Sequence, residues 1–208
     1  MTKRSRSSDR WLAEHASDPF VKKARAEGWR SRAVFKLEEI DRREGLLHHS
    51  ITVLDLGAAP GAWSQYVVKR IGSKGRVIAS DILPMDVIPG VEFVLGDFRE
   101  DEVLQQILAL SGERAVDLLL SDMAPNLSGM DVIDHPRAMY LAELAVDLAL
   151  RVLKPKGTAL IKLFQGSGFQ ELVANARRQF RTVRCLKPAA SRARSAETYL
   201  LATGLRMV

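Results

Sequence analysis

The sequence of residues 52–63 is TVLDLGAAPGAW, a short apolar run followed by a glycine-rich turn. We predict a buried strand over Thr52–Leu56 and a helix directly after the turn. In doubly wound α/β folds, the turn between the first strand and the next helix lies where a nucleotide-like ligand binds. Gly57 and Gly61 are four residues apart with Pro60 between them, unlike the GxGxxG of a dinucleotide site. The turn therefore predicts a ligand pocket and argues against a nicotinamide dehydrogenase.

Strands and helices alternate along the rest of the chain. Helices are expected over Asp18–Glu27, Ser31–Glu44 (with Ser31 as the N-cap), Ala62–Ile71, Asp101–Leu110, Pro136–Leu153 and Phe169–Phe180. Further strands are expected over Arg76–Ser80, Val91–Leu95, Val116–Ser121, Thr158–Phe164, Thr182–Lys187 and Thr198–Thr203. This order predicts an α/β fold with a mostly parallel, doubly wound sheet covered by helices on both faces. No helix separates the last two strands, so we expect them to pair antiparallel at that edge.

The composition bounds the class of protein. No apolar stretch approaches the ~18 residues of a membrane span, and the basic first residues are not followed by an apolar signal core. The single cysteine, Cys185, excludes an internal disulfide, and the four histidines lack the spacing of metal ligands. We expect a cytoplasmic, monomeric protein without a structural metal. Residues 1–16 are polar and expected to form a flexible tail, and residues 17–208 a single domain.

The net charge of +6 is unevenly distributed. Residues 1–32 carry a net charge of +5 and residues 176–194 carry +7, so the remainder of the chain carries −6. Two basic segments that flank an acidic body indicate a phosphate-binding surface, and the arginines that dominate them suit bidentate phosphate contacts. We therefore predict a nucleic-acid partner, contacted through residues 22–36 and 177–194.

Lys162 interrupts an otherwise apolar predicted strand. A lysine ammonium buried in such a strand costs several kcal/mol unless a charge pairs with it or solvent reaches it. It is therefore either a strand-end lysine that extends to water or a residue placed in a cleft for chemistry.

Four successive strands are predicted to end in an aspartate, and the sequence therefore places four carboxylates at one edge of the sheet. Asp81 follows the glycine turn by about 20 residues, the position from which a carboxylate accepts hydrogen bonds from ribose hydroxyls. Asp97 is placed to accept a hydrogen bond from the exocyclic amine of an adenine, with Phe98 beside the adenine ring. Asp55 and Asp122 complete the set.

The motifs DLGAAPG, GDF, SDMAPN and IKLFQG together resemble the Rossmann-fold S-adenosylmethionine-dependent RNA 2′-O-methyltransferases, and most closely the bacterial FtsJ/RrmJ family. The resemblance covers nearly the whole chain. It implies a seven-stranded methyltransferase fold with an antiparallel edge strand, S-adenosyl-L-methionine as methyl donor, and a Lys-Asp-Lys-Glu tetrad. Carried onto this sequence, the tetrad is Lys36, Asp122, Lys162 and Glu197. The implied donor contacts are Gly61, Trp63, Asp81, Asp97 and Asp122, and no metal is implied.

The resemblance also implies the substrate, a uridine in the A loop of 23S ribosomal RNA presented in the assembled 50S subunit. The segment after Asp122 favours a sugar hydroxyl over a base, because no aromatic residue follows Pro125 to hold a flipped base. Transfer RNA or another structured RNA is the alternative substrate, and a non-catalytic RNA-binding protein the alternative class. The sequence leaves open whether Lys162 is a general base or an orienting group, since Lys36 lowers its pKa whereas Asp122 and Glu197 raise it.

Overall fold

The computed structural model describes residues 17–125, 130–192 and 195–206. The predicted tail, residues 1–16, lies outside the described residues. The helices are α2 (Pro19–Ala26), α3 (Val34–Glu44), α4 (Ala62–Ile71), α5 (Asp101–Ser111), α6 (Asp131–Val152) and α7 (Phe169–Gln179). The strands are β1 (Thr52–Leu56), β2 (Arg76–Asp81), β3 (Val91–Leu95), β4 (Val116–Ser121), β5 (Leu153–Phe164), β6 (Phe180–Leu186) and β7 (Glu197–Leu205).

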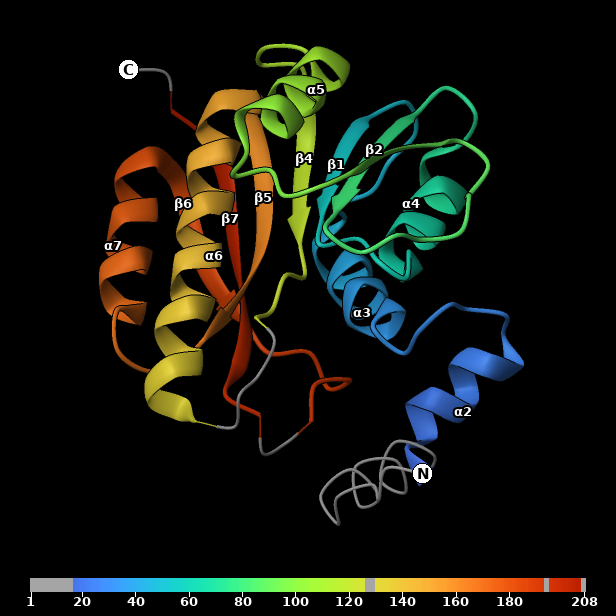
Figure 1. The fold of residues 1–208 in the computed structure, drawn as a ribbon, viewed down its shortest axis with the longest axis horizontal. Coiled ribbons are helices and arrows are strands. Elements are labelled where there is room, and N and C mark those ends of the chain that lie inside the picture. The colour runs from blue at the N-terminus through green and yellow to red at the C-terminus, as the bar shows by residue number, and fades with distance from the viewer. Residues whose placement is uncertain (1–16, 126–129, 193–194, 207–208) are drawn as a thin grey trace.

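The strands form one seven-stranded sheet in the order β3-β2-β1-β4-β5-β7-β6 (Figure 1). The strand order reverses between β1 and β4, which creates the crevice where doubly wound folds bind ligands. The predicted antiparallel strand is present as β7, which runs antiparallel to both β5 and β6. It lies one position in from the edge because β6 covers its outer side. The α/β class and the doubly wound sheet are confirmed.

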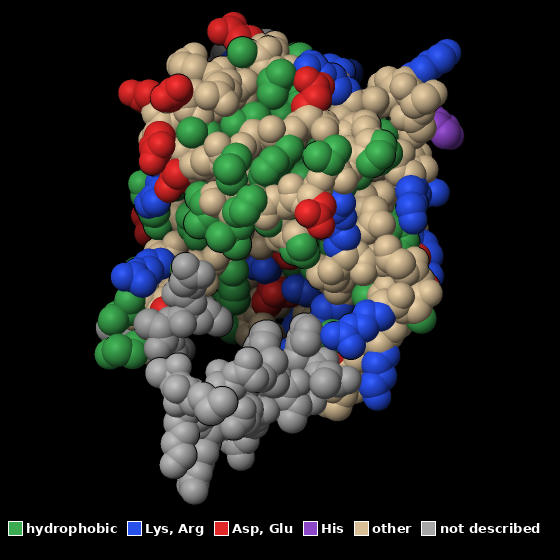
Figure 2. Space-filling view, turned by 45° about the vertical axis from the view of Figure 1, so that its right-hand side comes forward, with side chains coloured by type: hydrophobic (Ala, Val, Ile, Leu, Met, Phe, Trp, Pro, Cys, Tyr) green, Lys and Arg blue, Asp and Glu red, His purple; other side chains and the backbone are tan. Residues whose placement is uncertain are grey.

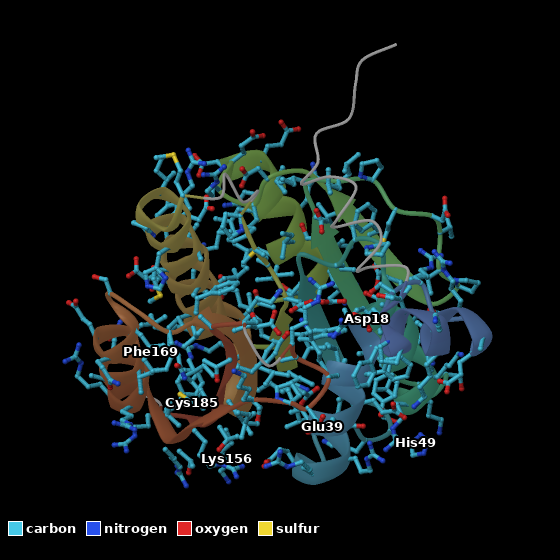
Figure 3. All side chains as sticks on the ribbon, turned by 90° about the horizontal axis from the view of Figure 1, so that it is seen from below. Asp18, Glu39, His49, Lys156, Phe169 and Cys185 are labelled. Atoms are coloured by element: carbon cyan, nitrogen blue, oxygen red, sulfur yellow. The ribbon has the colours of Figure 1, made fainter. Side chains whose placement is uncertain are left out.

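Helices cover both faces of the sheet and give it two apolar cores. One core packs α5, α6 and α7 against one face, and the other packs α3 and α4 against the opposite face. Viewed from below, Phe169 of α7 and Glu39 of α3 mark these two layers (Figure 3). The central strands are almost entirely apolar because both of their faces are buried. None of the described helices is long and apolar enough to cross a membrane.

Two predicted boundaries are wrong because local backbone bonds differ from the sequence pattern. The N-cap of α3 is Ala33, not Ser31, and Ser31 Oγ instead accepts a hydrogen bond from the Ala33 amide at 3.2 Å. Serine side chains often form such short local turns in place of a cap. Helix α6 begins at Asp131, five residues before the predicted Pro136. Its first turn is held by the Met130 carbonyl, which accepts from the amides of residues 133 and 134.

Strand β5 is also longer than predicted. It starts at Leu153, directly after α6, and includes Lys154–Gly157, which lie between the predicted helix and the predicted strand. Lys156 has a φ of 68°, and the pairing with β4 shifts register between Val116 and Leu118. The turn-forming residues thus make an irregular strand end rather than a separate loop.

Candidate active site

Lys162 lies near the carboxyl end of β5 with only 8% of its surface exposed. Its Nζ lies 2.7 Å from Asp122 Oδ1 and donates a hydrogen bond to the Asp122 carbonyl at 2.9 Å. Glu197 Oε2 lies 3.7 Å away. The ammonium is therefore paired inside the protein and does not extend to bulk water.

Lys36 and Glu197 complete the same cluster. Lys36 Nζ lies 2.7 Å from Glu197 Oε1 and donates to Oε2 at 2.9 Å. The four tetrad residues come from α3, from the end of β4, from β5 and from the start of β7. The structure therefore brings together, in one mostly buried group, the four residues that the resemblance implied. Their catalytic roles remain a prediction.

The electrostatics of the cluster favour charged side chains. Burial lowers the pKa of Lys162, but the charges of Asp122 and Glu197 outweigh it and raise that pKa above its ordinary value. Burial raises the pKa of Asp122, but the two ammonium groups, Lys162 foremost, outweigh it and lower that pKa below its ordinary value. Lys162 is thus an ammonium at neutral pH in this state. A charged ammonium is a hydrogen-bond donor and cannot accept a proton, so this protonation state favours the orienting alternative, which stays a prediction.

A cleft of about 290 Å³ lies beside the cluster, at the carboxyl ends of β1, β2, β3 and β4. Its polar lining includes Asp81, Asp97 and Asp122, and its apolar lining includes Ile82 and Phe98. Three of the four predicted carboxylates therefore share one cleft.

Gly57, which lines the cleft, packs tightly against the neighbouring strand end. Gly57 has a φ of 71°, and a Cβ there would lie 2.6 Å from Met123 Cγ. A side chain at this position would therefore clash with the segment that carries Asp122. Carboxylates beside apolar side chains match S-adenosylmethionine, which combines a cationic sulfonium and a ribose diol with a flat adenine ring. The residues present fit the methyl donor, and this cleft of about 290 Å³ is called the donor cleft below.

Asp81 and Asp97 differ in how much of each carboxylate is already engaged. Asp81 accepts the amides of Ala59 and Leu83, each at 2.8 Å, so each oxygen keeps a lone pair for a ligand. Asp97 is paired with Arg99, and that hydrogen bonding lowers its pKa. An adenine amine that donates to Asp97 would compete with Arg99 for the same carboxylate oxygens. The sequence did not indicate this competition.

Neither Gly61 nor Trp63 is among the residues that line this cleft. Gly61 is the N-cap of α4, with a φ of 98°, and Trp63 is 3% exposed. The Trp63 indole donates to the Ala33 carbonyl at 2.8 Å and packs against Tyr199. Since neither residue lines the cleft, the donor contacts at these two positions stay a prediction. The first backbone amides of α4 have no hydrogen-bond partner within the helix, and amides of this kind suit a ligand carboxylate such as that of the methyl donor.

Asp55, the fourth strand-end aspartate, is fully buried and does not line the donor cleft. Its Oδ2 accepts from Ser64 Oγ at 2.6 Å, whereas Oδ1 has no partner among the described residues. It lines a cavity of about 20 Å³ that it shares with Asp122. Burial raises the pKa of Asp55 to about 7, although the Ser64 bond opposes this and nearby Asp122 and Asp81 add to it.

Two further side chains belong to the cluster, and the sequence analysis missed both. Tyr199 donates to Asp122 Oδ1 at 2.6 Å, and Ser191 donates to Glu197 Oε1 at 2.8 Å. Tyr199 lies two residues after Glu197 in β7, and residues two apart in a strand share a face of the sheet. This spacing was the only signal in the sequence.

A second opening, of about 270 Å³, leads to the cluster from the other side. Arg32, Lys36, Arg192 and Glu197 line it. Arg32 and Arg192 both pair with Asp18, the buried N-cap of α2. The space-filling view shows Lys and Arg side chains gathered around a hollow on this side of the molecule (Figure 2). This opening therefore combines arginine side chains with access to two tetrad residues, Lys36 and Glu197.

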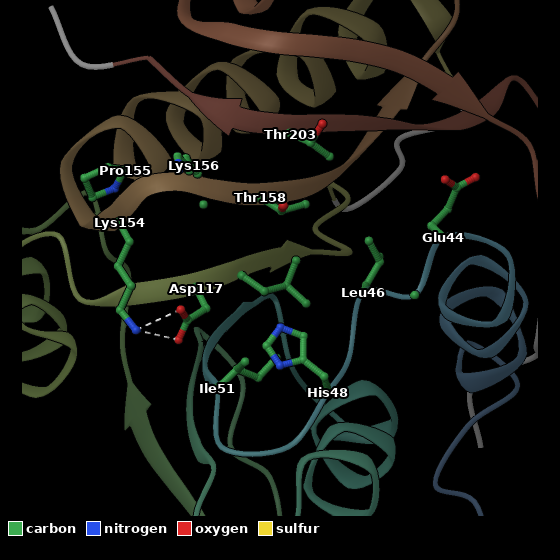
Figure 4. Close-up of a pocket in the computed structure, with 13 residues that line it drawn as sticks. Glu44, Leu46, His48, Ile51, Asp117, Lys154, Pro155, Lys156, Thr158 and Thr203 are labelled. Carbon is green, nitrogen blue, oxygen red and sulfur yellow. Dashed lines mark hydrogen bonds and ion pairs between the residues drawn. The ribbon is translucent and has the colours of Figure 1, made fainter.

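Another cavity lies at the opposite edge of the sheet (Figure 4). It has a volume of about 350 Å³ and lies between the amino ends of β4 and β5 and the segment after α3. Its main charged groups are already paired, since Lys154 donates to both oxygens of Asp117 at 2.8 Å. It contains none of the predicted site residues, so we place the active site at the other edge. Among the described residues, no cluster suited to a metal ion is present.

The sheet order, the glycine turn and the carboxylate cleft define an S-adenosylmethionine-dependent methyltransferase. Residues 29–205 match the model of the FtsJ-like methyltransferase family, and the chain belongs to that family. It is therefore a methyltransferase that takes its methyl group from S-adenosyl-L-methionine.

Similar proteins cover nearly the same length. The chain is 60% identical over 204 residues to ribosomal RNA large subunit methyltransferase E of Legionella pneumophila strain Corby, which is 98% of this chain and 99% of that protein. The protein of the same name from strain Lens is 59% identical over 204 residues. A crystal structure described as a ribosomal RNA methyltransferase from Plasmodium falciparum superposes with a TM-score of 0.76 at 28% identity. That match covers 85% of this chain and 98% of the other.

Proposed function

We propose that this protein transfers a methyl group from S-adenosyl-L-methionine to the ribose 2′-hydroxyl of a uridine in the A loop of 23S ribosomal RNA, in the assembled large subunit. The observation that carries the reaction type is the paired Lys36–Glu197 and Lys162–Asp122 cluster between the donor cleft and the arginine-lined opening. The similarity of the chain, over 98% of its length, to a ribosomal RNA large subunit methyltransferase supports ribosomal RNA as the substrate class.

The chemistry needs little beyond positioning. The bound donor supplies a methyl group that its positively charged sulfur has already activated. Asp122 lines the donor cleft, and Lys162 lies beside Asp122. A ribose that enters through the second opening therefore meets both side chains. The Lys162 ammonium donates to the 2′-hydroxyl oxygen and directs a lone pair toward the methyl carbon. As the new C–O bond forms, the bond between the methyl carbon and sulfur breaks, its electron pair stays on sulfur, and a neutral thioether leaves. The hydroxyl proton passes to a carboxylate of the cluster or to water.

Lys36 and Glu197 hold this arrangement in place. Their pairing neutralises charge that would otherwise be buried alone, and Glu197 lies within 3.7 Å of Lys162 Nζ. Two ammonium groups and two carboxylates leave the cluster without net charge. It therefore tolerates a cationic donor on one side and an anionic RNA on the other.

The substrate is tested by supplying labelled methyl donor with undermodified large subunits, naked ribosomal RNA, transfer RNA or capped RNA, and mapping the label. We expect the label on one ribose of the large-subunit RNA, with assembled subunits labelled fastest. Preferential labelling of transfer RNA contradicts the substrate but keeps the reaction type. Label on a base contradicts both.

Donor binding is expected to depend on the two strand-end carboxylates of the cleft. Asp81→Ala and Asp97→Ala should each weaken the donor affinity measured by calorimetry about 10–150-fold, because each loses hydrogen bonds worth about 1.5–3 kcal/mol. Glu92→Ala is the control, since Glu92 is an exposed β3 carboxylate paired with Arg76 outside the cleft. Unchanged affinity in both cleft variants would place the donor elsewhere.

RNA binding is expected to depend on Arg192 at the second opening. Arg192→Gln should raise the KM for RNA, and should reduce the slope of log affinity against log salt by about one, because one phosphate contact is lost. Arg76→Gln removes another exposed arginine, on β2, and should change neither quantity. Equal salt slopes for the Arg192 variant and the unmodified protein would exclude this opening as the RNA path.

A further inference from the structure

Tyr199 lies directly opposite Lys162 in the antiparallel pair of β7 and β5. Directly opposed residues in such a pair project to the same face of the sheet. The tyrosine ring is fully buried and packs against Trp63, with ring centroids 5.8 Å apart. Lys36 Nζ lies 5.9 Å from the centroid of the same ring. The ring is thus fixed in the middle of the tetrad without belonging to it.

The Tyr199 hydroxyl has two acceptors of unequal distance. It donates to Asp122 Oδ1 at 2.6 Å, while Glu197 Oε1 lies 3.4 Å away. A phenol has one proton to donate, so the shorter bond to Asp122 is the principal one. Burial raises the pKa of Tyr199 well above its ordinary value, and the charges of Asp122 and Glu197 act in the same direction. The hydroxyl therefore keeps its proton and remains a donor.

Both partners of Asp122 engage the same oxygen. Lys162 Nζ also lies 2.7 Å from Oδ1, whereas Oδ2 has no hydrogen-bond partner among the described residues. Asp122 lines the donor cleft, where the remaining oxygen is available to a ligand or to the reacting hydroxyl. A carboxylate held through one oxygen by two donors from neighbouring strands has little freedom to rotate.

We propose that Tyr199 is a positioning residue for methyl transfer, whose hydroxyl fixes the Asp122 carboxylate so that Oδ1 holds Lys162 and Oδ2 faces the site of reaction. The inference rests on the proposed function. Without the hydroxyl, Asp122 rotates about its side-chain bonds and Lys162 loses its fixed direction. The reacting oxygen then spends less time aligned with the methyl carbon.

The decisive variant is Tyr199→Phe, which removes one oxygen and keeps the ring that packs on Trp63. We expect kcat to fall roughly 10–150-fold, the effect of losing a hydrogen bond to a charged acceptor. The KM for RNA and the dissociation constant of the donor should change little in comparison. A purely structural role would instead alter binding and rate together, or neither.

A matched control is available in the same protein. Tyr66 is also buried, on α4, and donates to a buried carboxylate, Asp41 Oδ2, at 2.9 Å. Tyr66→Phe removes the same atom from the same kind of bond outside the tetrad. It should lower the melting temperature about as much as Tyr199→Phe does, and it should leave kcat unchanged.

A double variant tests whether Tyr199 acts through Asp122. In single-turnover measurements, adding Tyr199→Phe to Asp122→Asn should cost less than twofold, because the group that the hydroxyl orients is already lost. Independent losses that multiply would overturn the inference, as would a kcat of Tyr199→Phe equal to that of the unmodified protein. Failure of the proposed function is seen separately, as unmodified protein that places no label on large-subunit RNA.

Discussion

Lys162→Ala is expected to lower turnover about 10²–10⁴-fold while the fold and donor binding are retained, the range observed for a positioned acid–base or orienting group. The structure gives the reason. Lys162 Nζ has two close contacts with Asp122, which lines the donor cleft, and a longer one with Glu197, which lines the second opening. The check is single-turnover methylation of large-subunit RNA, with donor affinity measured in parallel.

The same strand supplies a matched control for this variant. Lys154 is also on β5 and also pairs with an aspartate of the β4 region, Asp117, but at the opposite edge of the sheet. Lys154→Ala should leave turnover unchanged. Lys162→Met serves as a second variant, because it removes the charge but keeps most of the side-chain volume. If either Lys162 variant turns over at the rate of the unmodified protein, Lys162 has no role in the chemistry.

The other tetrad residues should show smaller and non-additive effects. Lys36→Ala and Glu197→Ala each remove one member of a pair that supports Lys162. Groups that act as a unit lose most of their effect once one member is gone, so combining either change with Lys162→Ala should cost little more than Lys162→Ala alone.

The sequence predicted the parts of the site that depend on strand ends. The burial of β5 makes an unpaired Lys162 costly, and successive parallel strands place Asp81, Asp97 and Asp122 at one edge. These inferences need only the strand pattern and the rule that ligands bind at strand carboxyl ends. The convergence of Lys36 and Glu197 on that edge was available only from the resemblance, because neither pattern nor spacing brings α3 and β7 together.

What the sequence missed depends on register and on side-chain direction. Tyr199 enters the site because β7 pairs antiparallel with β5 in one particular register, and a shift of one residue would turn it to the other face. The Trp63 indole donates to the Ala33 carbonyl, a contact between distant segments that the sequence did not indicate. Pro136 suggested a helix start, whereas a preceding turn held by the Met130 carbonyl extends the helix. Each case is decided by strand register or by one particular hydrogen bond, and the pattern of residue types specifies neither.

Asp55→Asn is expected to raise the free energy of unfolding at about pH 8 by up to about 4 kcal/mol. Burial raises the pKa of Asp55 in the folded state from 3.8 to about 7. A raised pKa means that the folded protein holds this proton more tightly than the unfolded chain does. The favourable contribution is therefore present below the unfolded value and is lost as the pH rises through about 7. Each pKa unit corresponds to about 1.4 kcal/mol, which gives the expected size.

The measurement is denaturant unfolding of both proteins at about pH 4.5 and about pH 8. The gain from Asp55→Asn should be small at the lower pH, where Asp55 is mostly protonated in the folded protein, and largest at the higher one. Asparagine has nearly the same shape and can keep the Ser64 contact, so the difference isolates the charge. Asp147→Asn, which neutralises an exposed carboxylate on α6, should show no comparable pH-dependent gain.

The expected gain also bears on why the aspartate is present. A fully buried carboxylate with one unpartnered oxygen lowers the stability of the protein, and such groups are retained mainly where a site uses them. Asp55 shares a small cavity with Asp122, and the charges of Asp122 and Asp81 add to its raised pKa. The raised pKa of Asp55 is thus coupled to the charges of two carboxylates that line the donor cleft. An equal gain at both pH values, or a less stable variant at about pH 8, would mean that the buried charge is compensated within the protein.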